Sequence, residues 1–148
     1  MFRKLSDNLF ASPQIGLPEL AEAQAMGITA IINNRPEAES EDQTPGDQIE
    51  AAARAAGMDY VAIPVTHAGF SAGQVEAMAT ALQNARGPVL AYCRSGTRST
   101  LLWALAEASR GANPATLSAQ AAAAGYDISP VRAMVDMLAA NAGSSQGT

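Results

Sequence analysis

Hydrophobic and polar positions divide the chain into short apolar runs and longer amphipathic segments. The short runs are rich in β-branched and aromatic residues and are followed by polar or turn-forming residues, which predicts strands. The longer segments carry apolar residues at helical spacing and are bounded by Ser, Asn, Pro or Gly, which predicts helices. We expect strands at residues 9–11, 28–33, 60–65 and 89–92, and helices at 17–26, 46–56, 71–85, 98–110, 114–124 and 130–140, with Ser71, Asn113 and Ser129 as N-caps.

Strands that alternate with helices predict an α/β domain of three layers. Its centre is expected to be a mostly parallel sheet of about four strands, with helices on both faces. The length of 148 residues fits one domain with a single core. We expect this domain to cover residues 1–142 and a disordered tail to cover 143–148. The acidic segment 36–45 is expected to be a solvated loop.

Charge and composition restrict the partners. The net charge is −5 and the pI is about 4.7, which argues against a surface for nucleic acid or anionic membranes. One cysteine allows no internal disulfide, and no segment has the pattern of a signal peptide or a membrane span, so we expect a soluble, cytoplasmic protein. The chain has one histidine and one cysteine, too few nitrogen and sulfur ligands for a typical metal site, and we expect neither a metal nor a cofactor.

The segment after the apolar run 88–92 is the strongest candidate for chemistry. There Cys93 is followed by arginines, hydroxyl residues and a glycine, and then by a predicted helix. A helix N-terminus directs unpaired N–H groups toward the sulfur, and with a nearby arginine it can lower a thiol pKa from ~8.5 to roughly 3.5–7.5. A lone buried cysteine is usually a small apolar core residue. The polar residues that follow are poor core material and favour a thiolate nucleophile in an anion-binding loop.

Two resemblances follow from these residues. The segment CRSGTRS, residues 93–99, resembles the active-site loop of rhodanese-type sulfurtransferases, in which four residues separate the cysteine from an arginine, here Arg98. Cysteine-dependent phosphatases use five, and that position holds Ser99. From about Leu5 to Leu138, the order of elements is similar to small bacterial beta-lactamase hydrolase-like proteins with a dual-specificity-phosphatase fold. Segments IINNRP (31–36) and YVAIPV (60–65) carry this similarity.

The rhodanese resemblance implies a sulfurtransferase. Cys93 would take sulfane sulfur from thiosulfate or a persulfide, and an external thiol or other acceptor would remove it, because the chain has no second cysteine. The expected partners are therefore a small anionic sulfur donor and a thiol acceptor. Arg98 is the second catalytic residue, and the expected anion-binding residues are Arg94, Ser95, Gly96, Thr97, Ser99 and Arg35.

Two alternatives remain open at this point. A phosphatase acting through a Cys93 thiophosphate would need a general acid, and the segment Pro64–Phe70, where related phosphatases place an aspartate, has no carboxylate. The candidate acids are His67, or one of Glu37, Glu39, Glu41 and Asp42 if segment 36–45 folds over the site. The other alternative is a non-catalytic anion-binding or persulfide-sensing module. Arg35 is equally consistent with a structural ion pair to the nearby glutamates, and Arg94 with an outward orientation.

Overall fold

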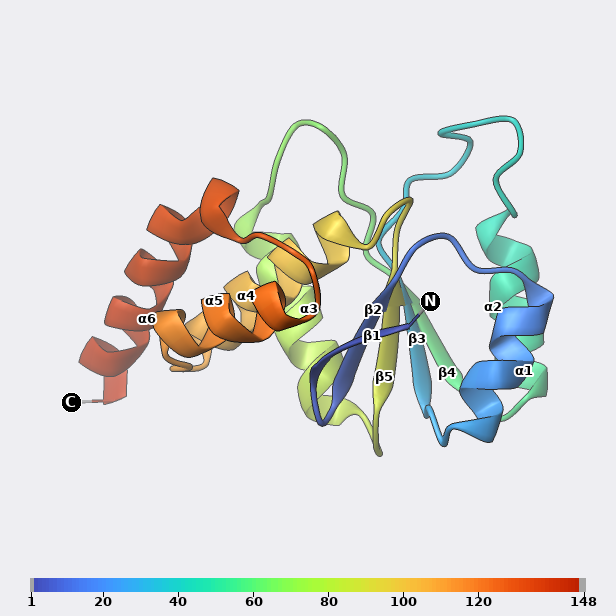
Figure 1. Cartoon of the computed structure of the whole chain (residues 1–148), viewed down its shortest axis with the longest axis horizontal. Coiled ribbons are helices and arrows are strands. Elements are labelled where there is room, and N and C mark those ends of the chain that lie inside the picture. Colours follow the sequence, from blue (N-terminus) through green and yellow to red (C-terminus); the bar gives the residue numbers. More distant parts are fainter. Residues whose placement is uncertain (1, 147–148) are drawn as a thin grey trace.

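A five-stranded sheet lies between two layers of helices in the computed structural model, which describes residues 2–146 (Figure 1). The strand order is β1-β2-β5-β3-β4; β1 is antiparallel to β2, and all other pairs are parallel. The elements in chain order are β1 (Arg3–Ser6), β2 (Leu9–Ser12), α1 (Leu17–Ala25), β3 (Ala30–Asn33), α2 (Gly46–Ala55), β4 (Asp59–Ala62), α3 (Ala72–Asn84), β5 (Val89–Tyr92), α4 (Thr97–Ser109), α5 (Pro114–Ala123), a 3-10 turn (Ser129–Val131) and α6 (Arg132–Gln146).

The predicted α/β class with a mostly parallel sheet is confirmed, but the expected strand number was one too low. The missed strand is β1, which pairs at the edge with β2 only. In its sequence RKLS only Leu5 is buried, so it has no apolar run to mark it. The strand expected at 60–65 is β4, which ends at Ala62 and forms the opposite edge of the sheet. Its Asp59, Val61 and Ala62 are exposed, whereas Ile63 and Val65, which follow it, are buried.

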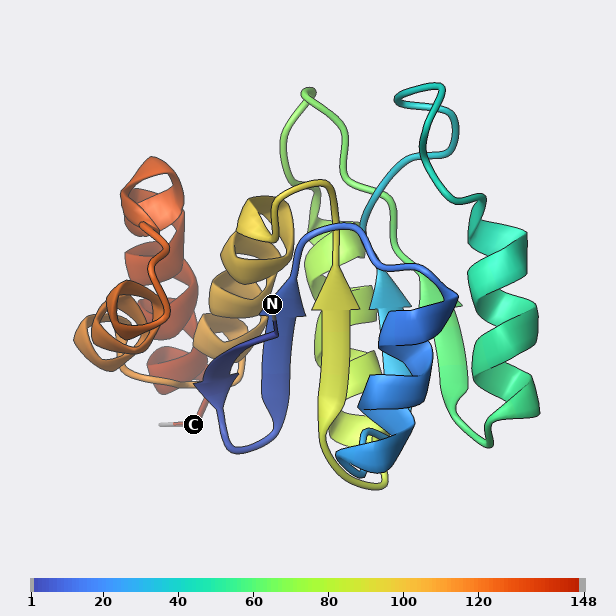
Figure 2. The same ribbon diagram turned by 45° about the vertical axis from the view of Figure 1, so that its right-hand side comes forward.

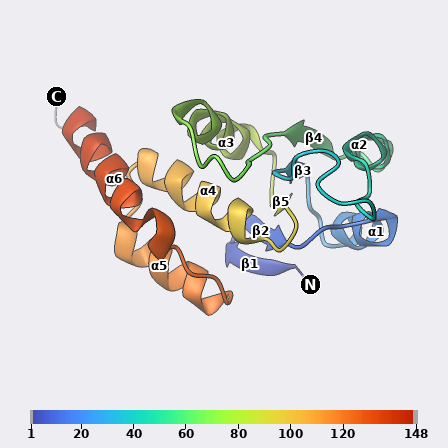
Figure 3. The same ribbon diagram turned by 90° about the horizontal axis from the view of Figure 1, so that it is seen from above.

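Each face of the sheet has its own apolar cluster, because side chains alternate along a strand. Leu90 and Tyr92 of β5 pack with residues of α1 and α2 on one face. Val89 and Ala91 pack with residues of α3 and α4 on the other. Figure 3, viewed along the strands, shows α1 and α2 on one side of the sheet and the remaining helices on the other.

Helix α4 is the most buried helix of the described chain, since every residue from Ser99 to Ala106 is buried. It packs against α3 and α6 and also contacts α5, so the outer helices α5 and α6 cover the side away from the sheet (Figure 2). β5 and α4 are joined by only four residues, 93–96. A buried strand and a buried helix therefore fix both ends of this short connection.

Two of the three predicted N-caps are confirmed. Ser71 Oγ accepts from the Gln74 N–H, and Asn113 Oδ1 accepts from two N–H groups in the first turn of α5. The prediction for Ser129 was wrong: it begins a 3-10 turn, its hydroxyl donates to Asp127, and α6 starts at Arg132. α6 continues to Gln146, into the segment expected to be a tail; residues 147 and 148 lie outside the described residues.

None of the helices between residues 2 and 146 is long and apolar enough to cross a membrane.

Candidate active site

The connection from β5 to α4 forms a loop around the Cys93 sulfur at the carboxyl ends of the parallel strands. Cys93 is completely buried, and its N–H donates to the Ser12 carbonyl at 3.3 Å. The Gly96 N–H donates to Cys93 Sγ at 3.1 Å. Gly96 has a φ of 93°, which favours glycine, and α4 begins directly after it. The thiol thus faces a backbone donor at the positive end of a helix, as predicted, and both stabilise a thiolate.

The three hydroxyl residues of this loop lie in different surroundings. Ser95 and Thr97 are exposed, and Ser95 Oγ donates to Thr97 Oγ1 at 3.0 Å. Ser99 lies in the first turn of α4 and is fully buried, yet its Oγ has no hydrogen-bond partner among the described residues. A buried hydroxyl without a partner is unfavourable, so the Ser99 hydroxyl is an unused donor in the first turn of α4.

Arg98 makes a bidentate ion pair instead of facing solvent. Its Nη1 and Nη2 donate to the two carboxylate oxygens of Glu39 at 2.8 and 2.9 Å, and Nη1 also donates to the Val65 carbonyl at 2.7 Å. The Arg98 side chain is 18% exposed. Its pKa is raised above the ordinary value, first by the Glu39 hydrogen bond, while burial opposes the shift and the nearby Cys93 sulfur adds to it. Arg98 therefore interacts electrostatically with the sulfur, while the Glu39 carboxylate is hydrogen-bonded to both terminal nitrogens of the Arg98 guanidinium group.

The acidic segment 36–45 is a loop with exposed or partly exposed residues, as expected, but Glu39 lies over the site and not in solvent. Besides Arg98, Glu39 accepts from Arg35 Nε at 2.9 Å. Hydrogen bonding to Arg98 and Arg35 outweighs the cost of desolvation and lowers the Glu39 pKa from 4.5 to about 2. Arg35 is only 4% exposed and also donates to Gln14 and Ser40. Arg35 thus pairs with a nearby glutamate, as in the structural alternative that the sequence left open for it.

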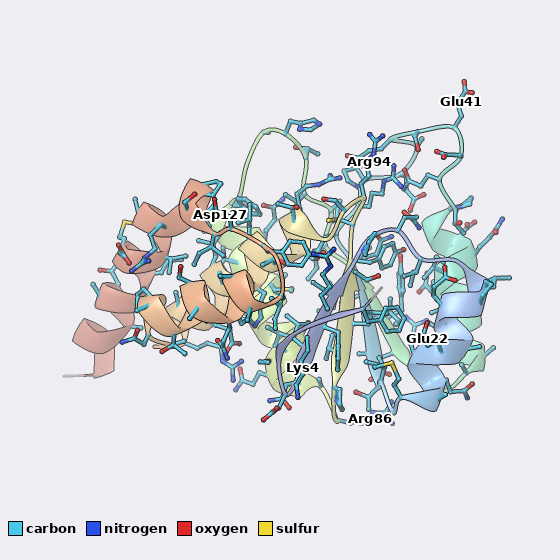
Figure 4. All side chains as sticks on the ribbon, viewed as in Figure 1. Lys4, Glu22, Glu41, Arg86, Arg94 and Asp127 are labelled. Atoms are coloured by element: carbon cyan, nitrogen blue, oxygen red, sulfur yellow. The ribbon has the colours of Figure 1, made fainter. Side chains whose placement is uncertain are left out.

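The remaining predicted residues lie at the surface. Arg94 is exposed, and Figure 4 shows it with Glu41 at the end of the molecule beyond the carboxyl ends of the strands. A hydrogen bond from Ser40 is the main cause that lowers the pKa of Asp42, and the Arg94 charge also contributes. His67 is exposed in the loop between β4 and α3. In the described part of the chain, no three His, Cys, Asp or Glu side chains are grouped to hold a metal ion.

Of the carboxylates considered as acids if segment 36–45 folds over the site, the structure places Glu39 on Arg98. One other contributor to this site was missed in the sequence. Tyr126 was not considered: its hydroxyl donates to the Ser95 carbonyl at 3.1 Å. Its position after α5, 31 residues from Ser95 in sequence, gave no local signal of this contact.

Residues 1–110 match the family described as "Beta-lactamase hydrolase-like protein, phosphatase-like domain". A curated relative, the beta-lactamase hydrolase-like protein of Agrobacterium fabrum, is 35% identical over 108 residues. This alignment covers 73% of the present chain but 25% of the relative. The present chain therefore matches about a quarter of the length of that protein.

Solved structures extend the similarity over nearly the whole chain. A candidate phosphatase from Neisseria meningitidis is 34% identical, with a TM-score of 0.80 over 92% of this chain and 96% of that one. TpbA from Pseudomonas aeruginosa, solved in complex with pTyr, is 17% identical, with a TM-score of 0.67 over 96% and 90% of the two chains, and this likeness concerns the fold alone. The predicted phosphatase-like fold is confirmed.

Proposed function

The chain belongs to the beta-lactamase hydrolase-like family through its phosphatase-like domain, and from this premise we propose that it is a cysteine-dependent phosphatase. The observation that carries the proposal is the hydrogen bond from the Gly96 N–H to Cys93 Sγ. It lies at the N-terminus of α4, close to Arg98, in a phosphatase-like fold. Sulfur transfer, the function expected from the loop length, becomes the second candidate, because the similar proteins favour phosphatase chemistry.

The reaction proceeds in two displacements on phosphorus. The Cys93 thiolate attacks the phosphorus atom of a phosphoester, the S–P bond forms, and the bond to the leaving oxygen breaks. Arg98 and the loop N–H groups stabilise the phosphoryl oxygens in the transition state. Water then attacks the thiophosphate, which releases inorganic phosphate and returns the thiolate. Neither displacement needs an oxidant or a second cysteine.

Glu39 is the general acid that we propose for the leaving oxygen. With its pKa at about 2, it is ionised near neutral pH while it is paired with Arg98. A phosphoryl dianion requires the same guanidinium group and displaces the Glu39 carboxylate. A carboxylate that loses Arg98 and lies beside a dianion has a raised pKa, so it takes up a proton and then donates it. His67, on an exposed loop, has no contact in the described structure that favours it over Glu39.

One specific observation favours the second candidate, sulfur transfer. Only four residues separate Cys93 from Arg98, one fewer than in the phosphatase loops described above, and the thiol is completely buried. A smaller ring suits a single sulfur atom better than a phosphoryl group. In this reaction the thiolate attacks the outer sulfur of thiosulfate, sulfite leaves with the electron pair of the broken bond, and an external thiol later takes the sulfur from the Cys93 persulfide.

A paired experiment separates the two functions. We expect the wild-type protein to hydrolyse an aryl phosphate, vanadate to inhibit it, and Cys93→Ser to be inactive. Thr116→Ala, an exposed change in α5 away from the loop, serves as the matched control and retains activity. Intact mass after incubation with thiosulfate completes the test. Uptake of one sulfur atom at Cys93, without any turnover of phosphate esters, would reject the phosphatase and support the sulfurtransferase.

A further inference from the structure

We infer that Tyr126 is a positioning residue that orients the backbone donor to the Cys93 thiolate. The inference rests on the proposed function only in requiring that Cys93 acts as a thiolate, and it holds for phosphoryl and sulfur transfer alike. Tyr126 lies outside residues 1–110, the part matched by the family, and belongs to the segment that joins α5 to the following 3-10 turn.

One peptide unit connects Tyr126 to the sulfur. The Tyr126 hydroxyl donates to the Ser95 carbonyl at 3.1 Å, and the N–H of the same peptide unit, that of Gly96, donates to Cys93 Sγ at 3.1 Å. No peptide bond of the described chain is cis, and in a trans peptide the C=O and N–H groups point in opposite directions. By holding the carbonyl outward, Tyr126 directs the N–H inward. Chains of hydrogen bonds also polarise one another, which strengthens the inner donor.

The backbone freedom of Gly96 makes this constraint necessary. A glycine at φ 93° can rotate its peptide more freely than any other residue, and the direction of its N–H is therefore not fixed by its own dihedral preferences. A Cβ atom at Gly96 would overlap the Tyr126 hydroxyl and come within 3.3 Å of the Ser12 backbone. The loop is thus enclosed between the end of β2 and Tyr126. The tyrosine restricts the orientation of the Gly96 peptide, which at other residues the Cβ atom would do.

Tyr126 is itself held in place from β1. The Arg3 guanidinium lies 5.2 Å from the centroid of the Tyr126 ring, and Arg3 Nη1 donates to the Ala124 carbonyl at 3.1 Å. The Tyr126 N–H donates to the Ala121 carbonyl at 2.9 Å. Burial raises the pKa of Tyr126, Arg3 opposes this shift and the Cys93 charge adds to it. The phenol therefore stays protonated near neutral pH and remains a donor.

The thiol pKa tests this role directly. It can be measured from the ultraviolet absorbance of the thiolate during a pH titration, with the corresponding Cys93→Ser protein as the blank, and this needs no access of a reagent to the buried sulfur. We expect Tyr126→Phe to raise the thiol pKa, so that the thiolate-to-thiol ratio at a given pH falls about threefold to tenfold, the effect of one hydrogen bond. The other charged groups near the thiol stay unchanged in this variant: Arg98 on α4, its partner Glu39, and Arg3 over the Tyr126 ring.

Tyr60→Phe is the matched control. Tyr60 is half-buried on the α2 side of the sheet, and its hydroxyl accepts from Asn33, so its loss should leave the thiol pKa unchanged. Arg3→Met provides a second variant that frees the tyrosine ring without removing the hydroxyl, and it should raise the thiol pKa by less. An unchanged or lower thiol pKa in Tyr126→Phe would overturn the inference. If the wild-type protein hydrolyses no phosphoester while the thiol pKa still shifts in Tyr126→Phe, the phosphatase proposal fails and this inference stands.

Discussion

The acidic segment 36–45 and the segment around Tyr126 hold residues 93–98 from different sides and by different chemistry (Figure 3). Glu39 binds the Arg98 side chain through two charged hydrogen bonds. Tyr126 binds the loop backbone through one neutral hydrogen bond. An anionic substrate competes with Glu39 for the guanidinium group but has no reason to compete with Tyr126. The first contact is therefore exchangeable during a reaction, whereas the second is permanent and preorganises the loop.

This difference assigns distinct kinetic roles to the two sides. Displacing Glu39 from Arg98 opposes substrate binding, and the displaced carboxylate is then available for proton transfer. Changes on this side should therefore alter KM and kcat by different amounts, depending on the leaving group. Changes on the Tyr126 side should alter the thiolate itself, and should therefore affect every reaction of Cys93 in the same way.

The largest effect is expected from Arg98→Met, which removes the residue shared by Glu39 and the substrate. The loop loses its cationic side chain for the phosphoryl oxygens, and kcat/KM for an aryl phosphate should fall about 10²–10³-fold, the usual consequence of losing one transition-state donor. Steady-state kinetics measure this loss.

Arg98→Lys sharpens the result because it keeps the charge but loses the bidentate geometry. We expect it to recover only part of the activity. Full activity in Arg98→Met would show that the guanidinium group takes no part in the reaction and that its pairing with Glu39 is purely structural.

The next largest effect is expected from Glu39→Gln and depends on the leaving group. Loss of a general acid should reduce kcat for an alkyl phosphate about 10²-fold, because the leaving alkoxide needs a proton. For an aryl phosphate, whose leaving phenolate is stable, kcat should change little and KM should fall, since the competitor for Arg98 is neutral.

The matched control is Glu41→Gln, which changes an exposed carboxylate of the same segment. It should leave kcat and KM unchanged for both substrates. Equal losses of kcat for alkyl and aryl phosphates in Glu39→Gln would contradict the role of Glu39 as the acid and restrict it to holding Arg98 and Arg35.

The two sides also differ in how well the sequence predicted them. The loop around Cys93 was predictable because its signal is local: a β-branched and aromatic run ends at Cys93, and a helix begins a few residues later. Caps at Ser71 and Asn113 are local for the same reason. Such features depend on residues within one or two turns of each other.

The partners of that loop come from far along the chain and have no such signal. Glu39 is 59 residues from Arg98, and within its own segment it is one carboxylate among several. Only the parallel order of β3 and β5 brings the ends of these two strands together. β1 was missed for a related reason: it is recognisable by its pairing with β2 and by its contact with α5, and not by its own composition.

A smaller effect is expected on stability in acid, and it belongs to the Glu39 side alone. The folded-state pKa of Glu39 is about 2, below its ordinary value of 4.5. The stabilisation is therefore fully present above pH 4.5 and is lost as the pH falls toward 2. It amounts to at most about 3–4 kcal/mol, because the pKa falls from 4.5 to about 2 and each pKa unit corresponds to about 1.4 kcal/mol.

Urea unfolding at neutral and acidic pH measures this contribution. Between these conditions, the free energy of unfolding should fall more in the wild type than in Glu39→Gln, and Glu41→Gln should behave as the wild type. An identical pH dependence in wild type and Glu39→Gln would mean that the ion pair with Arg98 and Arg35 gives no net stability.

The smallest effect is expected from Arg3→Met, which removes the side chain that holds the Tyr126 ring. It tests whether the contact between Tyr126 and the loop persists independently of pH. Loss of the cation near the ring and of the hydrogen bond to Ala124 should lower the free energy of unfolding by about 1 kcal/mol, independently of pH across the range where Glu39 titrates. Lys4→Met, an exposed neighbour in β1 that pairs with Asp7, is the matched control and should cost less. Because Arg3 makes no ion pair with a carboxylate among the described residues, an acid-dependent loss in Arg3→Met would contradict the division of the two sides into an exchangeable ionic contact and a permanent neutral one.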